Sequence, residues 1–402
     1  MIQTAKNQPV SAGNASSCCG GGQCGAAHPP VPPLNLPAVW KALADELMPE
    51  IRGILETGGY IMGPKVAAFE DALQRYTGAK HALGVSSGTD ALLLAMMALR
   101  LGPGDEVIVP TFTFFGTAGT VSRVGAKPVF CDIDPVTYNI DVRHMESLIT
   151  PRTKAIVPVH LYGQLADMRP LMEIARKRGI PVIEDACQAI GAREAGTDGK
   201  MAGQFGEFGS LSFYPTKNLG AMGDAGALLV NDTPLFETSK LLRTHGENPR
   251  YYHRLIGGNF RLDALQAAIL TIKLRHLDAW TQRRREIAAS YRIRFEAAGL
   301  APKHVGLPAE KHGMHTYHQF VVRVARRDDL CKHLTARGVG WGIYYPLPLH
   351  LQDCYTELGY KAGAMPHAER AADEVLALPM YPELTDAQLD SVVAAFAGFY
   401  SG

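Results

Sequence analysis

Residues 212–226 read SFYPTKNLGAMGDAG, and this stretch places one lysine, Lys217, between an apolar run and a glycine-rich turn. The runs on either side, GSLSFYP (209–215) and GALLVND (226–232), have the length and apolar composition of buried strands. Most lysines lie on the solvated surface. An apolar strand on one side and glycines on the other favour instead a lysine held at the end of a buried strand.

The same strand pattern recurs on the amino-terminal side of Lys217, with helical segments between the strands. The expected strands are HALGVS (81–86), DEVIVP (105–110), KPVFCDID (127–134), KAIVPVHLYG (154–163) and PVIEDAC (181–187). Near-continuous apolar strands that alternate with helices are typical of a mostly parallel sheet covered by helices on both faces. The sequence therefore predicts an α/β fold that binds its ligand at the carboxyl ends of the strands.

Three regions are expected along the 402 residues. Residues 1–33 are rich in Gly, Ser, Ala and Pro, and a disordered tail is predicted there. Residues 34–275 are predicted to form the large α/β domain. Residues 276–402 are predicted to form a smaller C-terminal α+β domain, with a strand at 318–324 and a closing helix at 386–400.

Composition argues against several classes of protein. The chain has 40 Lys plus Arg and 39 Asp plus Glu, so its net charge of +1 gives no electrostatic case for nucleic acid or for an anionic membrane. No signal-peptide pattern is visible, and the longest apolar run, at 91–99, is about half the length of a transmembrane helix, so a cytoplasmic location is expected. Seven cysteines form no disulfide framework, and Cys18, Cys19, Cys24 and His28 match no zinc spacing, so no metal is predicted.

Residues 86–90, SSGTD, lie between an expected strand and an expected helix. Gly88 allows close approach of the backbone, and the start of the helix offers free N–H groups and the positive end of its dipole. This combination can hold a phosphate. The alternative is an ordinary helix cap by Ser87 or Thr89.

Two ionisable residues lie at strand ends. Asp185 closes an apolar strand, where a carboxylate is costly unless it is paired. It could hold a protonated ring nitrogen, or it could cap the next helix or form a salt bridge. Lys217, if it is shielded from water, has its pKa lowered and can form a Schiff base with a carbonyl cofactor.

A fourth feature is the aromatic run Phe112, Phe114 and Phe115, in PTFTFFGT. We expect Phe114 to stack on a flat heterocycle and the other two rings to pack in the core. A phosphate site, a partner for a pyridinium, an amine for an aldehyde and a stacking ring together match pyridoxal phosphate.

These residues also resemble a known family. From about Leu34 to the end, the chain is similar to the DegT/StrS nucleotide-sugar aminotransferases, which have the fold-type I aminotransferase scaffold. The matching motifs are GPKVAAFE, SSGTDAL, GDEVIVPTFTF, PVHLYGQ, VIEDACQAIGA, GSLSFYPTKNLGAMGDAGAL, GGNFRLDALQAAIL and YYPLPLHLQ. The resemblance covers nearly the whole chain apart from the tail.

The resemblance implies a role for each matching residue. Lys217 would be the Schiff-base lysine and proton carrier, and Asp185 would pair with the pyridine nitrogen. The other cofactor contacts would be Gln188 near the ring hydroxyl, Gly88, Thr89 and Ser212 on the phosphate, and Asn259 reaching the phosphate from the partner subunit of a homodimer. The substrate contacts would be Arg261 on a carboxylate and His315, Tyr317 and His318 on the sugar nucleotide. His160 is expected to orient a neighbouring group rather than act as a base.

The resemblance also implies the reaction. Some relatives replace the lysine with histidine and dehydrate sugars, so Lys217 favours transamination. The run YYPLPLHLQDCYTELGY is most similar to enzymes that aminate C3 of UDP- or dTDP-linked 3-oxo sugars, with L-glutamate converted to 2-oxoglutarate. A place in surface polysaccharide or amino-sugar biosynthesis would follow. The alternatives are amination at C4, a lysine-dependent dehydration, and a cofactor-binding regulatory protein without turnover.

Overall fold

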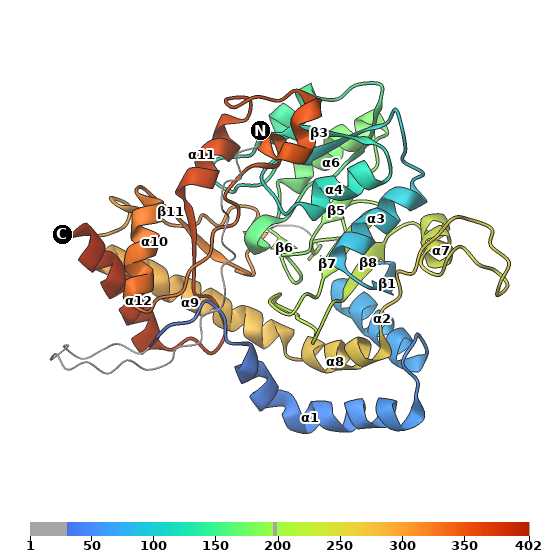
Figure 1. The fold of residues 1–402 in the computed structure, drawn as a ribbon, viewed down its shortest axis with the longest axis horizontal. Coiled ribbons are helices and arrows are strands. Elements are labelled where there is room, and N and C mark those ends of the chain that lie inside the picture. The colour runs from blue at the N-terminus through green and yellow to red at the C-terminus, as the bar shows by residue number, and fades with distance from the viewer. Residues whose placement is uncertain (1–29, 196–198, 402) are drawn as a thin grey trace, which may run out of the picture.

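The computed structural model describes residues 30–195 and 199–401. Its centre is a β-sheet with helices packed around it (Figure 1), formed by a four-stranded and a three-stranded part that isolated bridges join. Along the sheet the strands are β1 (His81–Val85), β8 (Gly226–Val230), β7 (Phe208–Ser212), β5 (Ile183–Asp185), β4 (Thr153–Ile156), β2 (Glu106–Pro110) and β3 (Lys127–Cys131). Two parallel bridges, Ile156 to Val182 and Val159 to Asp185, join β4 to β5. Of these strands, β8 alone runs opposite to the others. The predicted mostly parallel sheet is therefore confirmed.

The direction of β8 fixes where Lys217 lies. Strand β7 ends at Ser212 and β8 begins at Gly226, and the two strands pair antiparallel, with Ser212 opposite Gly226. The connection that holds Lys217 therefore begins and ends at the carboxyl edge of the parallel strands. This is the edge at which α/β sheets bind ligands.

Side chains that alternate along β8 separate the two faces of the sheet. Leu228 and Val230 belong to the same core as Leu92 and Leu94 of α3 (Gly88–Ala98). Ala227 and Leu229 point the other way, into a core with α2 (Pro64–Thr77) and α8 (Ala264–Leu274). A third core packs α6 (Met168–Arg178) against β2 and β4. Helices thus cover both faces, as predicted.

The remaining helices of this part follow the chain between the strands. Helix α1 (Leu36–Thr57) packs on α8 through Leu43 and Leu47. The others are α4 (Gly116–Arg123), α5 (Val142–Ser147), α7 (Thr233–Leu242) and a 3-10 turn at Leu161–Gly163. A short antiparallel pair joins β6 (Arg193–Glu194) to β10 (Gly313–Met314).

The C-terminal part has its own three-stranded antiparallel sheet, in the order β12 (Val375–Leu378), β11 (Phe320–Val324), β9 (Val305–Gly306). Its core packs α9 (Leu277–Ala297), α10 (Arg327–Ala336) and α12 (Asp386–Tyr400) around this sheet. Helix α11 (Pro366–Glu374) and the 3-10 turns at Leu349–Leu351 and Asp353–Leu358 instead pack on the core of the large sheet. The C-terminal part therefore contacts the carboxyl edge of the main sheet.

The amino-terminal boundary differs from the prediction. Val31, expected within the tail at 1–33, is buried and pairs in parallel with Val339. The apolar side chain of Val31 thus packs in the C-terminal core. Cys18, Cys19, Cys24 and His28 lie outside the described residues. Among the described helices, none is both long and apolar enough to cross a bilayer.

Candidate active site

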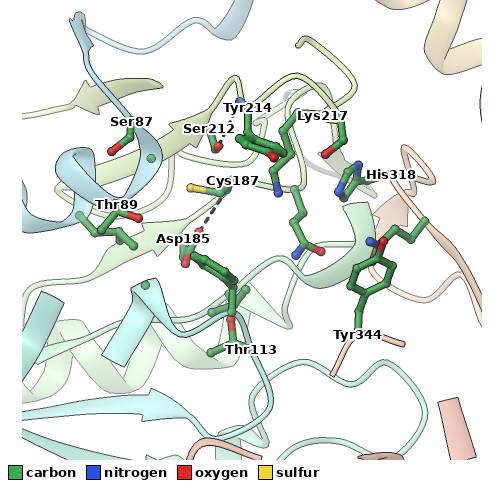
Figure 2. Close-up of a pocket in the computed structure, with 18 of the residues that line it drawn as sticks. Ser87, Thr89, Thr113, Asp185, Cys187, Ser212, Tyr214, Lys217, His318 and Tyr344 are labelled. Carbon is green, nitrogen blue, oxygen red and sulfur yellow. Dashed lines mark hydrogen bonds between the residues drawn. The ribbon is translucent and has the colours of Figure 1, made fainter. Parts of the chain in front are cut away.

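A cavity of about 570 Å³ opens at the carboxyl edge of the main sheet (Figure 2). Its walls come from the start of α3, the ends of β5 and β7, the Lys217 connection and the C-terminal part. The structure brings together most of the predicted site residues here, namely Gly88, Thr89, Phe114, Asp185, Gln188, Ser212, Lys217 and His318.

One end of the cavity is built by the first turn of α3. Ser87 caps this helix, since its Oγ accepts the backbone N–H of Asp90 at 3.0 Å. The following N–H groups, of Gly88 and Thr89, belong to the first turn, which has no intrahelical acceptors for them. A Cβ atom on Gly88 would lie 2.7 Å from both Cys187 Sγ and the Cβ of Ser212. Glycine is therefore required at this position by packing, and the binding of a phosphate by these N–H groups remains a prediction.

Asp185 stands at the end of β5 with 5% of its surface exposed. Its Oδ2 accepts the hydroxyl of Thr117 at 2.7 Å, and its Oδ1 accepts the backbone N–H of Cys187 at 3.2 Å. No lysine, arginine or histidine of the described chain forms an ion pair with it. A buried carboxylate that lines a cavity and has only neutral donors is complementary to a cationic ligand.

Lys217 enters the same cavity from the connection between β7 and β8 (Figure 2). Within the described residues, its Nζ forms no hydrogen bond or ion pair. Burial lowers the pKa of Lys217 below the usual value of 10.5, an effect that Cys187 and Asp185 partly offset. The amine is therefore closer to its neutral, nucleophilic form than a surface lysine is.

The connection that carries Lys217 is held from behind by α8. Lys273 of that helix is buried, and its ammonium donates to the carbonyl oxygen of Gly220. Within the connection, the backbone N–H of Lys217 donates to the carbonyl of Tyr214 at 2.8 Å, and that of Ala221 to Phe213 at 2.7 Å. These contacts fix the position from which the Lys217 side chain projects.

The side wall of the cavity combines an amide with aromatic rings. Gln188 accepts the backbone N–H of Tyr162 at 2.7 Å and donates to the hydroxyl of Tyr345 at 3.1 Å. Phe114 is 57% exposed and lies 6.4 Å from the Tyr345 ring, and Phe112 is buried as expected. Phe115, also expected in the core, is instead 46% exposed. Of the three phenylalanines, Phe114 alone lines the cavity. Its stacking role remains a prediction.

Of the three residues singled out in the motif HTYHQF, only His318 lines the cavity. His318 lines the cavity, and burial, with Lys217 nearby, holds the pKa of His318 well below its usual value. His315 and Tyr317 do not line it. Their rings stack on each other at 4.0 Å, and Tyr317 lies in the C-terminal core. Burial, with Arg285 and Arg292 nearby, lowers the pKa of His315 to about 3.

Three other predicted residues also lie outside this cavity. Asn259 is exposed, and Arg261 pairs through its backbone with Val85. Neither lines the cavity of its own chain, so their predicted contacts across a dimer remain predictions. His160 bonds Glu184 at 2.9 Å through Nε2, and its Nδ1 accepts the N–H of Ala166. Its ring therefore holds Glu184, and only its backbone N–H contacts Asp185, at 3.0 Å.

Sequence reasoning missed Thr117, Tyr214, Tyr344 and Tyr345. Thr117 contacts Asp185, and the three tyrosines line the cavity. Tyr344 and Tyr345 belong to the motif YYPLPLHLQ, which indicates the family resemblance but not a cavity wall. Thr117 lies in a helical segment, GTAG, that has no recognisable site pattern. No local pattern shows that this helix faces Asp185.

The described residues fit pyridoxal phosphate. The first turn of α3 offers the N–H groups of Gly88 and Thr89 to a phosphate. Within the part of the chain that the structure describes, the buried Asp185 carboxylate has no cationic partner and the Lys217 amine has no hydrogen-bond partner. All three border one cavity that is large enough for a ring between them.

The sequence pattern of the DegT/DnrJ/EryC1/StrS aminotransferase family matches residues 41–397. The pleiotropic regulatory protein of Geobacillus stearothermophilus is 48% identical over 92% of this chain and 98% of its own length. The UDP-N-acetyl-3-dehydro-α-D-glucosamine 3-aminotransferase of Acidithiobacillus ferrooxidans is 44% identical over 89% of this chain and 95% of its own. The crystal structure of DesV from S. venezuelae matches with a TM-score of 0.88 and 41% identity, over 93% of this chain and 99% of its own. By sequence pattern, relatives and fold, this chain belongs to the DegT/DnrJ/EryC1/StrS aminotransferase family.

Proposed function

We propose that the protein is a pyridoxal phosphate-dependent aminotransferase that converts a nucleotide-linked 3-oxo sugar to the 3-amino sugar, with L-glutamate as donor. The observation that carries this proposal is the pair formed by Lys217 and Asp185 across one cavity. The amine has a lowered pKa, and among residues 30–195 and 199–401 neither its Nζ nor the buried Asp185 carboxylate forms an ion pair. Such a pair suits a cofactor that needs a nucleophilic amine at its aldehyde and an anion at its ring nitrogen.

Each residue has one task in this proposal. When bound, the cofactor supplies an electron sink for the carbon from which a proton is removed. Asp185 holds the ring nitrogen in its protonated form by charge. The N–H groups of Gly88 and Thr89, with the hydroxyl of Ser212, bind the phosphate. Gln188 would contact the ring, and its amide is held by the backbone N–H of Tyr162 and the hydroxyl of Tyr345.

Lys217 Nζ is the group that moves the proton. Its lowered pKa keeps a fraction of the amine neutral, so it can take the proton from the α-carbon of the amino donor. It can then deliver that proton within the same cavity. His318 is held neutral by burial, so it adds no competing positive charge beside Lys217.

The substrate class rests on the relatives. The Acidithiobacillus ferrooxidans protein is named for amination at C3 of a UDP-linked sugar, and two further relatives are named for dTDP-3-amino-3,4,6-trideoxy-α-D-glucose. Tyr214 and Tyr344 line the same cavity as Lys217 and offer hydroxyls to a diphosphate or a sugar. Binding the nucleotide away from the reacting carbon would help to position the ketone.

We further propose a cytoplasmic homodimer with a shared active site. Asn259 is exposed, and it follows a segment whose Tyr251, Tyr252 and Ile256 are 73%, 70% and 94% exposed. Large exposed apolar groups of this kind mark interaction surfaces. A partner chain over this segment would bring Asn259 to the neighbouring phosphate site, and Arg261 to a carboxylate.

The test is the visible absorption of the cofactor-loaded protein, followed through one reaction cycle. L-Glutamate is added first, then 3-oxo and 4-oxo sugar nucleotides in turn. The proposal expects glutamate to bleach the absorption and a 3-oxo sugar to restore it. Lys217→Ala should abolish turnover and leave the fold intact, whereas Lys177→Ala, an exposed lysine of α6, should not change the rate. Near-normal turnover by Lys217→Ala would overturn the assignment.

A regulatory role without turnover is a second candidate, because the Geobacillus stearothermophilus relative is named as a regulatory protein. Such a protein would bind the cofactor, and its absorption would not respond to glutamate. Restoration of the absorption by a 4-oxo sugar alone would move the substrate to the C4 branch.

A further inference from the structure

We propose that Thr117, oriented by Thr113, is a positioning residue that keeps the Asp185 carboxylate aimed at the cofactor ring. The proposal rests on the proposed function, since it assigns the ring nitrogen to Asp185. Thr117 is not among the described residues that line the cavity, so it acts through Asp185 rather than by contact with the cofactor.

The direction of the hydrogen bonds follows from the number of protons. Thr117 Oγ1 lies 2.7 Å from Asp185 Oδ2 and 3.1 Å from Thr113 Oγ1. A hydroxyl has one proton, and a carboxylate can only accept. Thr117 therefore donates to Asp185, and Thr113 donates to Thr117. The result is a chain of two hydroxyls that ends on the carboxylate.

Burial increases the importance of this pair of hydrogen bonds. Thr117 is fully buried, Thr113 is 2% exposed and Asp185 is 5% exposed, so water does not replace a lost donor readily. Hydrogen bonds in series strengthen one another in such surroundings. Both carboxylate oxygens are engaged, Oδ2 by Thr117 and Oδ1 by the N–H of Cys187. These two donors fix the plane of the carboxylate and the directions in which its remaining lone pairs point.

Removal of the Thr117 hydroxyl should lower the rate of the reaction with glutamate and leave the affinity for glutamate unchanged. With this donor lost, the Asp185 carboxylate is free to rotate. It then holds the protonated ring nitrogen less firmly, which weakens the electron sink. A hydrogen bond to a charged group corresponds to roughly a 10- to 100-fold change in rate. We expect that loss in kcat for the glutamate half-reaction, with KM unchanged.

Helix α4 provides a matched control. Thr120 is as buried as Thr117 and lies one turn further along, but its hydroxyl donates to the backbone carbonyls of Gly116 and Thr117, at 3.0 and 3.1 Å. Thr120→Val therefore removes a buried hydroxyl from the same helix without touching Asp185. Any general effect of such a substitution on packing appears in this control.

The experiment compares cofactor-loaded wild type with Thr117→Val, Thr117→Ser and Thr120→Val. Single-turnover reduction by glutamate and the pH dependence of the cofactor absorption are measured for each. The titratable groups that face Asp185 are Lys217, Cys187 and Tyr345, and all three are unchanged in these variants. We expect Thr117→Val to be reduced by glutamate more slowly than wild type and to show a shifted pH dependence of the cofactor absorption. Thr117→Ser should have nearly the wild-type rate, and Thr120→Val should match wild type in both measurements.

Thr117→Val with the rate and the pH profile of Thr120→Val would overturn the proposal, and so would failure of Thr117→Ser to rescue the rate. If the valine variant does not fold, Thr117→Ala is compared with Thr120→Ala in the same way. A wild type that binds pyridoxal phosphate without responding to glutamate would refute the proposed function instead. The positioning role would then be judged by the pH profile alone.

Discussion

Lys273 offers a test of how the Lys217 connection is anchored. It is 7% exposed on α8, and its ammonium donates to Gly220, three residues beyond Lys217. Burial lowers the pKa of Lys273 from 10.5 to about 8. At about 1.4 kcal/mol for each pH unit, this difference corresponds to about 3 kcal/mol of folding free energy.

The sign follows from proton counting. Between about pH 8 and 10.5 the unfolded chain keeps the Lys273 proton and the folded chain releases it, so stability rises with pH over this range. The Lys273→Met variant has no titratable group at this position, so its unfolding free energy lacks this pH dependence. The difference in unfolding free energy, wild type minus variant, should therefore grow by about 3 kcal/mol from about pH 7 to about pH 11.

Urea unfolding at a series of pH values measures this difference directly. Lys177→Met, at an exposed position on α6, is the matched control, and its difference from wild type should stay flat with pH. The variant also leaves the Gly220 carbonyl without its donor, so we expect slower reaction with glutamate. A wild-type minus Lys273→Met difference that does not change with pH would refute the reasoning.

Three further predictions concern the cavity. Gly88→Ala places a Cβ 2.7 Å from Cys187 Sγ, so the dissociation constant of pyridoxal phosphate should rise by at least about tenfold in a fluorescence titration. Gly53→Ala on α1, which meets nothing within 4 Å, should leave that constant unchanged. Asp185→Asn removes the buried charge, so stopped-flow reduction by glutamate should slow by about 100-fold or more while the cofactor still binds; a loss below about threefold would contradict its role. The rate with glutamate should increase with pH and level off below pH 10.5, because burial lowers the pKa of Lys217; a rise that continues past that value would contradict a shielded amine.

Much of the fold could be predicted from local pattern. The strands that flank Lys217 and the strand before Asp185 are apolar runs bounded by turn residues, and the structure has them where they were expected. Strand direction was not readable, because β7 and β8 have the same apolar composition as the parallel strands. Their antiparallel pairing is set by the return of the chain at one edge, which is a tertiary property.

The site residues could likewise be predicted where local pattern places them, and not where their contacts depend on tertiary packing. Asp185 ends a strand, and Gly88 and Lys217 follow the ends of two others; because these ends share one edge of the sheet, the sequence predicted that the three residues meet. Thr117 was missed because its contact depends on how α4 packs over β5. His315 and Tyr317 do not line this cavity, and their contact with the sugar nucleotide remains a prediction. The polar motif HTYHQF does not show that Tyr317 turns into the C-terminal core.

The residues that line the cavity are far apart in the sequence and are therefore synthesised at different times. Ser87 and Gly88 emerge early, Lys217 at mid-chain, and Tyr344 and Tyr345 near the end of synthesis. Domains fold as units during synthesis, with the amino-terminal part first. All strands of the main sheet are therefore synthesised before the C-terminal segments that line the cavity and pack on the core of that sheet.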